Sequence, residues 1–322
     1  MNVLVTGGAG YLGTTLAPVL LDRGHRVAVF DSLRFGPAPL LPLFRREGFT
    51  FARGDVRDRA TLERFARDSH ADAVVHLAAI VGYPACARWP DEARTTNVDG
   101  TANVAAVAGR DRPVLLASTS SCYGRVADEP CTEETPLHPL SLYGTSKAQA
   151  ESIVLDRGGG GRGGIVYRIA TAYGLSPRLR LDLLINDFVY RALHEHRLAV
   201  YEGHARRSFL HVADIARAIG LALENPGAML GRVFNVGDED QNYTKLDVCR
   251  LIQRHVPGVQ IEDCPDGRDA DRRDYAVSYA RIRAAGFRAE VPIDRGLAEL
   301  AAALRWIDRP EDLLNPGPTS MA

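Results

Sequence analysis

Short apolar runs alternate with amphipathic stretches through the first half of the chain. The runs carry apolar residues at consecutive positions rather than at every second one, as strands buried on both faces of a parallel sheet do. This alternation predicts an α/β fold, a Rossmann doubly wound parallel sheet with helices on both faces. The expected strands are 2–6, 26–30, 49–52, 73–77, 114–117 and 165–169, and the expected helices between them are 14–23, 91–108 and 142–155.

The pattern loosens after about residue 173, where prolines, arginines and short segments predict a smaller C-terminal lobe of mixed structure. A helix is expected again at 212–223 and a strand at 232–235, and together they would bring the chain back to the sheet. The expected division assigns residues 1–172 and 212–236 to the sheet domain, 173–211 and 237–309 to the smaller lobe, and 310–322 to a frayed tail.

Composition narrows the class of protein. The chain has 322 residues, of which 46% are hydrophobic and 25% charged, as in a globular protein that buries a core. A net charge of −1 argues against a nucleic-acid partner bound by a broad basic surface. No apolar run approaches the roughly 18 residues of a membrane span, and the start of the chain lacks the features of a signal peptide. Five cysteines without a CxxC pair predict neither a disulfide framework nor a zinc ribbon, which favours a reducing cytoplasm.

The histidines do not indicate a metal site. His194 and His196 are two residues apart and would point away from each other on a helix. His76 lies inside the apolar strand 73–77, where a buried histidine with satisfied ring nitrogens is the simpler interpretation. No metal centre is therefore expected.

A glycine-rich turn follows the first expected strand. Residues 6–13 read Thr-Gly-Gly-Ala-Gly-Tyr-Leu-Gly and lead into a helix. Such a turn allows positive φ and close approach of the backbone to a pyrophosphate, which the first N–H groups of the helix then bind. Asp31 ends the second strand, 18 residues after the last of these glycines, where a carboxylate binds the adenosine ribose and repels a 2′-phosphate. The pattern predicts a site for NAD rather than NADP, although Arg34 lies close to Asp31.

Tyr143 and Lys147 are four residues apart near the start of the expected helix 142–155, so both would project from one face. An ammonium beside the phenol favours the phenolate, whose ordinary pKa is about 10. A phenol so placed can accept a proton from an alcohol while a hydride leaves the same carbon. Only Lys147 and Lys245 are lysine among the 39 basic residues, which suggests that arginine does not serve at position 147.

Hydroxyl side chains follow the fifth expected strand. Residues 118–121 read Ser-Thr-Ser-Ser, and hydroxyls at the carboxyl end of a parallel strand lie over the ligand crevice. We expect Thr119 to hydrogen-bond the reacting oxygen, so that Thr119, Tyr143 and Lys147 form the catalytic group.

Together these segments resemble the extended short-chain dehydrogenase/reductase family, in its NAD-dependent sugar-nucleotide epimerase/dehydratase branch, and the UDP-glucose 4-epimerase type within it. The resemblance extends from Thr6 to about Ser278. The motifs that carry it are TGGAGYLG at 6–13, FDSL at 30–33, GDV at 54–56, HLAA at 76–79, NVDGT at 97–101, STSSCYG at 118–124, YGTSK at 143–147 and YRIATAYG at 167–174.

The resemblance implies that the sheet domain binds NAD, that the smaller lobe binds a nucleoside-diphosphate sugar, and that the protein is a homodimer. It makes Tyr143 the acid/base, Lys147 its supporting cation and Thr119 the hydroxyl partner. The cofactor-binding residues expected from the turn, the strand ends and the resemblance are Gly7, Gly10, Tyr11, Leu12, Asp31, Ser32, Asp55, Val56, Leu77, Ala78, Ala79, Asn97, Tyr143 and Lys147. The expected substrate-binding residues are Ser120, Ser121, Thr171, Asn186, Arg207 and Arg268. The two arginines would bind phosphate, because a guanidinium donates two hydrogen bonds at once.

The chain also departs from the family's patterns. The 4,6-dehydratases carry Thr-Asp-Glu where residues 119–121 are Thr-Ser-Ser, so the carboxylates that eliminate water are missing. Epimerases keep an asparagine where Thr171 stands, which alters how the sugar would be held. Residues 80–86 replace the family's variable substrate loop, so Tyr83 and Cys86 either face the sugar or serve in packing.

The sequence therefore predicts a cytoplasmic, NAD-dependent epimerase of a nucleoside-diphosphate sugar, inverting C4 ahead of other carbons through a transient 4-keto sugar. The first alternative is a dehydratase, a decarboxylase or a net oxidoreductase acting on a related sugar nucleotide, and the missing carboxylates argue against the dehydratase. The second is a non-catalytic NAD-binding protein of the same fold, against which the intact pair of Tyr143 and Lys147 argues.

Overall fold

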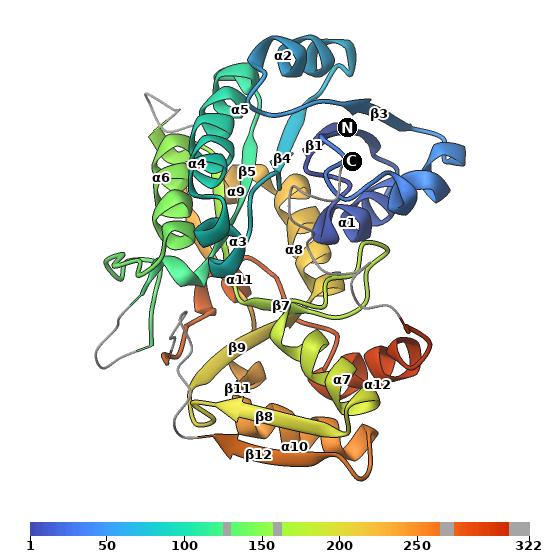
Figure 1. Ribbon diagram of the computed structural model, residues 1–322. Helices are drawn as coiled ribbons and strands as arrows, with labels where there is room; N and C mark the ends of the chain where they lie inside the picture. Colours follow the sequence, from blue (N-terminus) through green and yellow to red (C-terminus); the bar gives the residue numbers. More distant parts are fainter. Residues whose placement is uncertain (125–129, 157–162, 265–273, 309–322) are drawn as a thin grey trace.

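The computed structural model describes residues 1–124, 130–156, 163–264 and 274–308. Figure 1 shows a large sheet flanked by helices in the upper half of the molecule and a smaller lobe below it. The expected tail at 310–322 and the expected phosphate ligand Arg268 lie outside the described residues.

Seven strands form the central sheet in the order β3-β2-β1-β4-β5-β6-β10, and every neighbouring pair is parallel. The order reverses between β1 and β4, so a crevice opens there at the carboxyl ends of the strands. The expected Rossmann sheet is confirmed, and each expected strand lies within two residues of its observed ends. The strands are β1 Asn2–Thr6, β2 Arg26–Asp31, β3 Phe49–Arg53, β4 Ala73–His76, β5 Val114–Thr119, β6 Ile165–Ile169 and β10 Val233–Val236.

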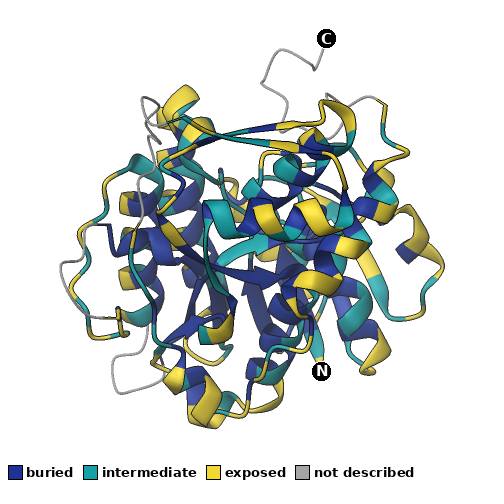
Figure 2. Cartoon of the chain, turned by 90° about the horizontal axis from the view of Figure 1, so that it is seen from below, coloured by how far each residue is buried: buried dark blue, intermediate teal, exposed yellow. Residues whose placement is uncertain are grey.

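Consecutive apolar residues in β1 serve both faces of the sheet. Val3 and Val5 pack into the core beneath α1 and α8, whereas Leu4 packs into the core beneath α2, α5 and α6. Because both faces are covered, an alternating pattern is absent from the sequence. Figure 2 shows the buried strands between layers whose outer surfaces are exposed. These helices are α1 Tyr11–Asp22, α2 Arg59–Asp68, α5 Gly100–Ala108, α6 Leu142–Asp156 and α8 Val212–Glu224.

Two helical segments differ from the sequence-based expectation. The expected single helix 91–108 is divided into α4 Pro90–Arg94, a π-helical turn Thr95–Asp99, and α5. The turn surrounds Asn97, whose side chain is tied to a distant loop, and π turns of this kind are frequent at functional sites. Helix α2 was not expected, although Asp58 caps it by accepting a hydrogen bond from the backbone N–H of Thr61.

The smaller lobe holds a three-stranded sheet, β11-β9-β7, and a separate parallel pair, β8 and β12. Its core forms around Tyr173, Phe209 and Ile252 and is distinct from the two cores of the large sheet. The strands are β7 Thr171–Tyr173, β8 Arg197–Tyr201, β9 Arg206–His211, β11 Asn242–Thr244 and β12 Gln260–Cys264, and the helices are α7 Leu184–His194, α10 Lys245–His255 and α12 Ile293–Leu304. Shorter helices are α3 Tyr83–Arg88, α9 Pro226–Met229 and α11 Ala280–Ala284, with 3₁₀ turns at Ala38–Arg45, Ser120–Cys122 and Glu239–Gln241. Within the described ranges, no helix is long and apolar enough to cross a membrane.

Candidate active site

A cavity of about 790 Å³ lies at the carboxyl ends of β1, β2, β4 and β5 and reaches into the smaller lobe. Gly7, Asp31, Leu77 and Thr119 line it from the four strand ends, and Arg207 lines it from β9. Its volume is in the range of small-molecule and cofactor sites, and its place is the point where the strand order reverses. The fold therefore brings residues expected to bind the cofactor and residues expected to bind the substrate to one cavity.

The glycine turn leaves room for a ligand that approaches the backbone. Gly7 has a φ of +73°, and a Cβ at this position would lie 2.5 Å from the backbone nitrogen of Ala78. Helix α1 begins directly after Gly10, and no side chain caps its first turn. Uncapped N–H groups at a helix start suit a phosphate group. Of the residues expected here, Gly7, Gly10, Tyr11, Leu12, Leu77, Ala78 and Ala79 all line the cavity.

Asp31 and Asp55 line the same part of the cavity, with Ser32 and Val56 beside them. The Asp31 carboxylate accepts hydrogen bonds from the backbone N–H groups of Ala9, at 3.0 Å, and Leu33, at 2.7 Å. Burial raises the pKa of Asp31 in spite of these two bonds. Burial would also raise the pKa of Asp55, but ion pairing with Arg57 outweighs it and leaves that pKa lowered. These residues fit the adenosine half of NAD.

Tyr143 and Lys147 both line the cavity from α6, as their spacing predicted. Lys147 is 3% exposed, and this burial lowers the pKa of its ammonium to about 8, against the opposing influence of Cys122 and Glu151. Burying a charged lysine this deeply lowers the free energy of unfolding by several kcal/mol, so a protein keeps such a residue chiefly where its charge has a function. The burial of Lys147 therefore indicates a functional position.

The hydroxyl groups after β5 are arranged as a short chain. Thr119 Oγ donates to Ser121 Oγ at 3.1 Å and accepts from the backbone N–H of Ser121 at 3.2 Å. Thr119 and Ser121 line the cavity, whereas Ser120 does not, and its carbonyl accepts a hydrogen bond from the hydroxyl of Tyr275. The segment is thus fixed at its centre and presents a hydroxyl on either side.

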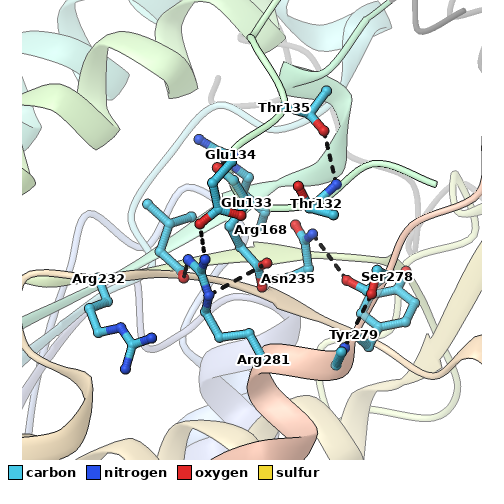
Figure 3. Close-up of polar contacts among 12 residues, drawn as sticks. Thr132, Glu133, Glu134, Thr135, Arg168, Arg232, Asn235, Ser278, Tyr279 and Arg281 are labelled. Carbon is cyan, nitrogen blue, oxygen red and sulfur yellow. Dashed lines mark hydrogen bonds and ion pairs between the residues drawn. The ribbon is translucent and has the colours of Figure 1, made fainter. Parts of the chain in front are cut away.

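A buried ion pair lies behind Lys147. Glu151, one turn further along α6, accepts a hydrogen bond from Ser118 and is bound by the guanidinium of Arg168, with 2.7 Å from Nη2 to Oε2. Arg168 also donates to the carbonyl of Glu133, and Figure 3 shows Arg168 close to Glu133, Asn235 and Arg281. This network joins α6 and β6 to the segments before α6 and around α11.

Asn97, expected near the cofactor, shapes the wall of the cavity. It is buried, accepts from the backbone N–H of Ile80 at 2.8 Å, and donates to the carbonyl of the same residue at 3.0 Å. Ile80 lines the cavity, whereas Asn97 is not among the lining residues. The π-helical turn thus presents Asn97 to the loop that follows β4.

The smaller lobe contributes Thr171 and Arg207 to the cavity, and Arg207 is only 8% exposed. Asn186 lies elsewhere, because its side chain is fully buried and bonded to the backbone N–H of Gly174 and the carbonyl of Arg180. Its observed contacts hold the loop between β7 and α7, and Asn186 does not line the cavity.

Several cavity residues of the smaller lobe were missed from the sequence. Arg180 lines the cavity and is paired with Asp182, at 2.5 Å from Nη2 to Oδ2. Burial would lower the pKa of Arg180, but the pairing with Asp182 and, after it, the Coulombic interaction with Tyr143 leave that pKa raised. Tyr201 and Lys245 also line the cavity, and Lys245 Nζ donates to the carbonyl of Tyr201 at 3.0 Å. The sequence could have drawn attention to Lys245, because it is one of only two lysines, but it holds no feature that singles out Arg180, Asp182 or Tyr201.

The remaining sequence candidates take structural roles. His76 is buried and bonded through both ring nitrogens to Thr6 and Thr101, and burial lowers its pKa to about 3, which confirms a neutral core histidine. Cys86 packs in the interior, whereas Tyr83 lines the cavity. The five cysteines are free. In the part of the chain that the structure describes, no group of three possible metal ligands occurs.

Comparison with known proteins places this site in a family. A family model described as the NAD dependent epimerase/dehydratase family matches residues 3–237. UDP-glucuronic acid decarboxylase 1 of Arabidopsis thaliana is 30% identical over 318 residues, which cover 95% of this chain and 70% of the relative. UDP-glucose 4-epimerase of Corynebacterium glutamicum is 30% identical over 280 residues, covering 81% of this chain and 83% of the relative.

Solved structures agree with the sequence relatives. The dTDP-glucose 4,6-dehydratase of Bacillus anthracis, in complex with NAD, matches with a TM-score of 0.81 at 27% identity, covering 94% of this chain and 96% of that one. The chain therefore belongs to the NAD dependent epimerase/dehydratase family of sugar-nucleotide-modifying enzymes, which confirms the resemblance seen in the sequence and NAD as the coenzyme.

Proposed function

We propose that the protein epimerises a nucleoside-diphosphate sugar at C4 through a transient 4-keto sugar. The observation that carries the proposal is that Tyr143 and Lys147, both on α6, line the same cavity as the glycine turn. NAD, held by the glycine turn and Asp31, would supply the acceptor and donor for reversible hydride transfer at the sugar carbon. No net oxidation results, so the coenzyme is regenerated in each turnover.

Tyr143 is the proposed acid and base. Its phenolic oxygen accepts the proton of the C4 hydroxyl as the hydride departs, and returns that proton when the hydride comes back. The ammonium of Lys147 lowers the free energy of the phenolate, and Thr119 holds the reacting oxygen by a hydrogen bond. The assignment of cofactor and catalytic roles to these residues is part of the proposal.

A cavity-lining arginine of the smaller lobe supports a diphosphate ligand. Arg207 lines the cavity from β9 of the smaller lobe, and a guanidinium suits paired phosphate oxygens. We include Arg268 as the expected second phosphate ligand and Ser121 and Thr171 as residues around the sugar, whereas Ser120, which does not line the cavity, is left out. The relatives named above carry UDP-glucose, UDP-glucuronic acid and dTDP-glucose in their names, which supports a sugar nucleotide as substrate.

The carboxylates of the cavity do not favour elimination of water. Residues 120 and 121 are serines, and neither can serve as the carboxylic acid or base of a dehydratase. Among the described lining residues of the smaller lobe, Asp182 is paired with Arg180 and Asp187 with Arg191. Simple proton return by Tyr143 needs neither carboxylate, which favours epimerisation over dehydration. The expected homodimer and cytoplasmic location remain predictions.

The proposal is tested with a panel of UDP-, dTDP-, GDP- and CDP-sugars that includes UDP-glucuronic acid, followed by proton NMR in heavy water. We expect inversion at C4 without uptake of solvent deuterium at carbon. Deuterium at a neighbouring carbon would indicate enolisation, loss of carbon dioxide would indicate a decarboxylase, and either result would overturn the proposal. Turnover of any sugar nucleotide would exclude a protein that only binds NAD.

A further inference from the structure

Five charged residues line the end of the cavity that contains Asp31. Besides Asp31 they are Arg34, Asp55, Arg57 and Glu92, contributed by the loops after β2 and β3 and by α4. This set, called here the adenosine end, has three carboxylates against two guanidiniums. Its formal charge is therefore −1, although an arginine lies three residues after Asp31.

Each of the two arginines is matched with its own carboxylate. Arg34 Nη1 lies 2.5 Å from Glu92 Oε1, and Arg57 Nη2 lies 2.6 Å from Asp55 Oδ2. Asp31 is held differently, by the two backbone N–H groups described above. The uncompensated charge at this end thus belongs to Asp31.

The side chain of Arg34 is fixed by its neighbours, but one of its N–H groups makes no hydrogen bond. Its guanidinium carbon lies 4.9 Å from the centre of the Trp89 ring, within the range of a cation–π contact. The side chains of Arg34 and Glu92 are 20% and 29% exposed. Nη2 of Arg34 is buried and has no hydrogen-bond partner in the structure. A buried N–H group without an acceptor is costly and points to a ligand that supplies one.

The charge of Arg34 bears on which coenzyme binds. A guanidinium near this carboxylate position is the usual means by which a Rossmann site accepts the 2′-phosphate of NADP. We propose that Glu92 determines coenzyme specificity through Arg34, because it cancels the positive charge while leaving the Nη2 donor for a neutral adenosine hydroxyl. Glu92 is then a positioning residue that reinforces Asp31. The inference concerns the coenzyme and is independent of the reaction performed on the sugar.

The test measures bound coenzyme rather than turnover. The purified protein is equilibrated with equal concentrations of NAD and NADP, separated from free coenzyme, denatured, and the released coenzymes are quantified by mass spectrometry. The variants are Glu92→Gln, Glu92→Asp and the double variant Arg34→Met with Glu92→Gln. Asp91→Asn is the control, since it removes the same charge from an exposed neighbouring position on α4.

We expect Glu92→Gln to raise the ratio of bound NADP to NAD about fivefold or more, as removal of one nearby charge does at a partly exposed site. Glu92→Asp and the double variant should keep the wild-type ratio, because the charge of Arg34 is cancelled in one and absent in the other. An unchanged ratio in Glu92→Gln, an equal rise in Asp91→Asn, or a raised ratio that persists in the double variant would overturn the inference. Loss of sugar turnover alone would bear on the proposed function and not on this result.

Discussion

Replacing Lys147 by methionine is expected to stabilise the fold while abolishing turnover. The side chain is 3% exposed, and methionine fills a similar volume without a charge to desolvate. Burial lowers the pKa of Lys147 from 10.5 to about 8, and the nearby Glu151 only partly opposes this shift. The folded protein therefore binds this proton more weakly than the unfolded chain does.

The pKa difference sets the size and the pH dependence of the effect. The pKa difference of 10.5 − 8 corresponds to about 3 kcal/mol. At pH 7 Lys147 is charged in both the folded and the unfolded state, so burial of its charge lowers the free energy of unfolding of the wild type by this amount. Between pH 8 and 10.5 the unfolded chain binds more protons than the folded protein, so the free energy of unfolding of the wild type rises with pH. The advantage of Lys147→Met should therefore shrink from about 3 kcal/mol at pH 7 to about 1 kcal/mol at pH 9.5.

The assay is urea unfolding of the coenzyme-free proteins at the two pH values, followed by circular dichroism. Arg64→Met on α2 is the control, because it removes an exposed cation from the surface and should show no such pH-dependent gain. A Lys147→Met protein that is less stable than wild type at pH 7, or an advantage that is equal at both pH values, would refute the reasoning.

Three further perturbations test the site. Glu151→Gln leaves the guanidinium of Arg168 buried without its carboxylate, and should reduce the free energy of unfolding by about 3 kcal/mol in urea titrations. A reduction well below about 1 kcal/mol would mean that solvent reaches the pair. Gly7→Ala should weaken NAD binding at least about tenfold in a direct titration, because the new methyl group meets the chain after β4. Gly24→Ala shares the positive φ but has open space around it, so it should leave NAD binding unchanged. Thr119→Ala should lower kcat about 10-fold to 100-fold with KM little altered, and Thr119→Ser should restore most of the rate.

The strands of the sheet could be predicted from the sequence because each one is marked by its own run of neighbouring apolar residues. Strands such as 2–6 and 165–169 are continuous apolar runs, and their two covered faces impose that composition along the chain itself. Tyr143 and Lys147 were readable for a similar reason, since one helix places them on one face. The division of the expected helix 91–108 was not readable, because the π-helical turn is stabilised by bonds from Asn97 to Ile80, far from it in sequence.

The substrate side of the site depends on contacts that no local pattern encodes. Tyr201 and Lys245 meet because β8 ends beside the start of α10, which requires the whole smaller lobe to be folded. Arg180 enters the cavity from an irregular loop, where arginine is too common in this chain to be informative. Asn186 shows the reverse case, since a motif match identified it although its amide holds that same loop through the carbonyl of Arg180.

The buried ion pair explains how Lys147 can serve Tyr143. Lys147 lies between Tyr143, four residues before it, and Glu151, four residues after it, and a carboxylate at that spacing attracts a lysine. Arg168 donates hydrogen bonds to both carboxylate oxygens of Glu151, and Ser118 donates to one of them as well. The carboxylate thus stays fixed behind Lys147 instead of drawing the ammonium toward itself. Side chains on a helix lean toward its N-terminus, which favours an approach of the lysine toward Tyr143 rather than toward Glu151.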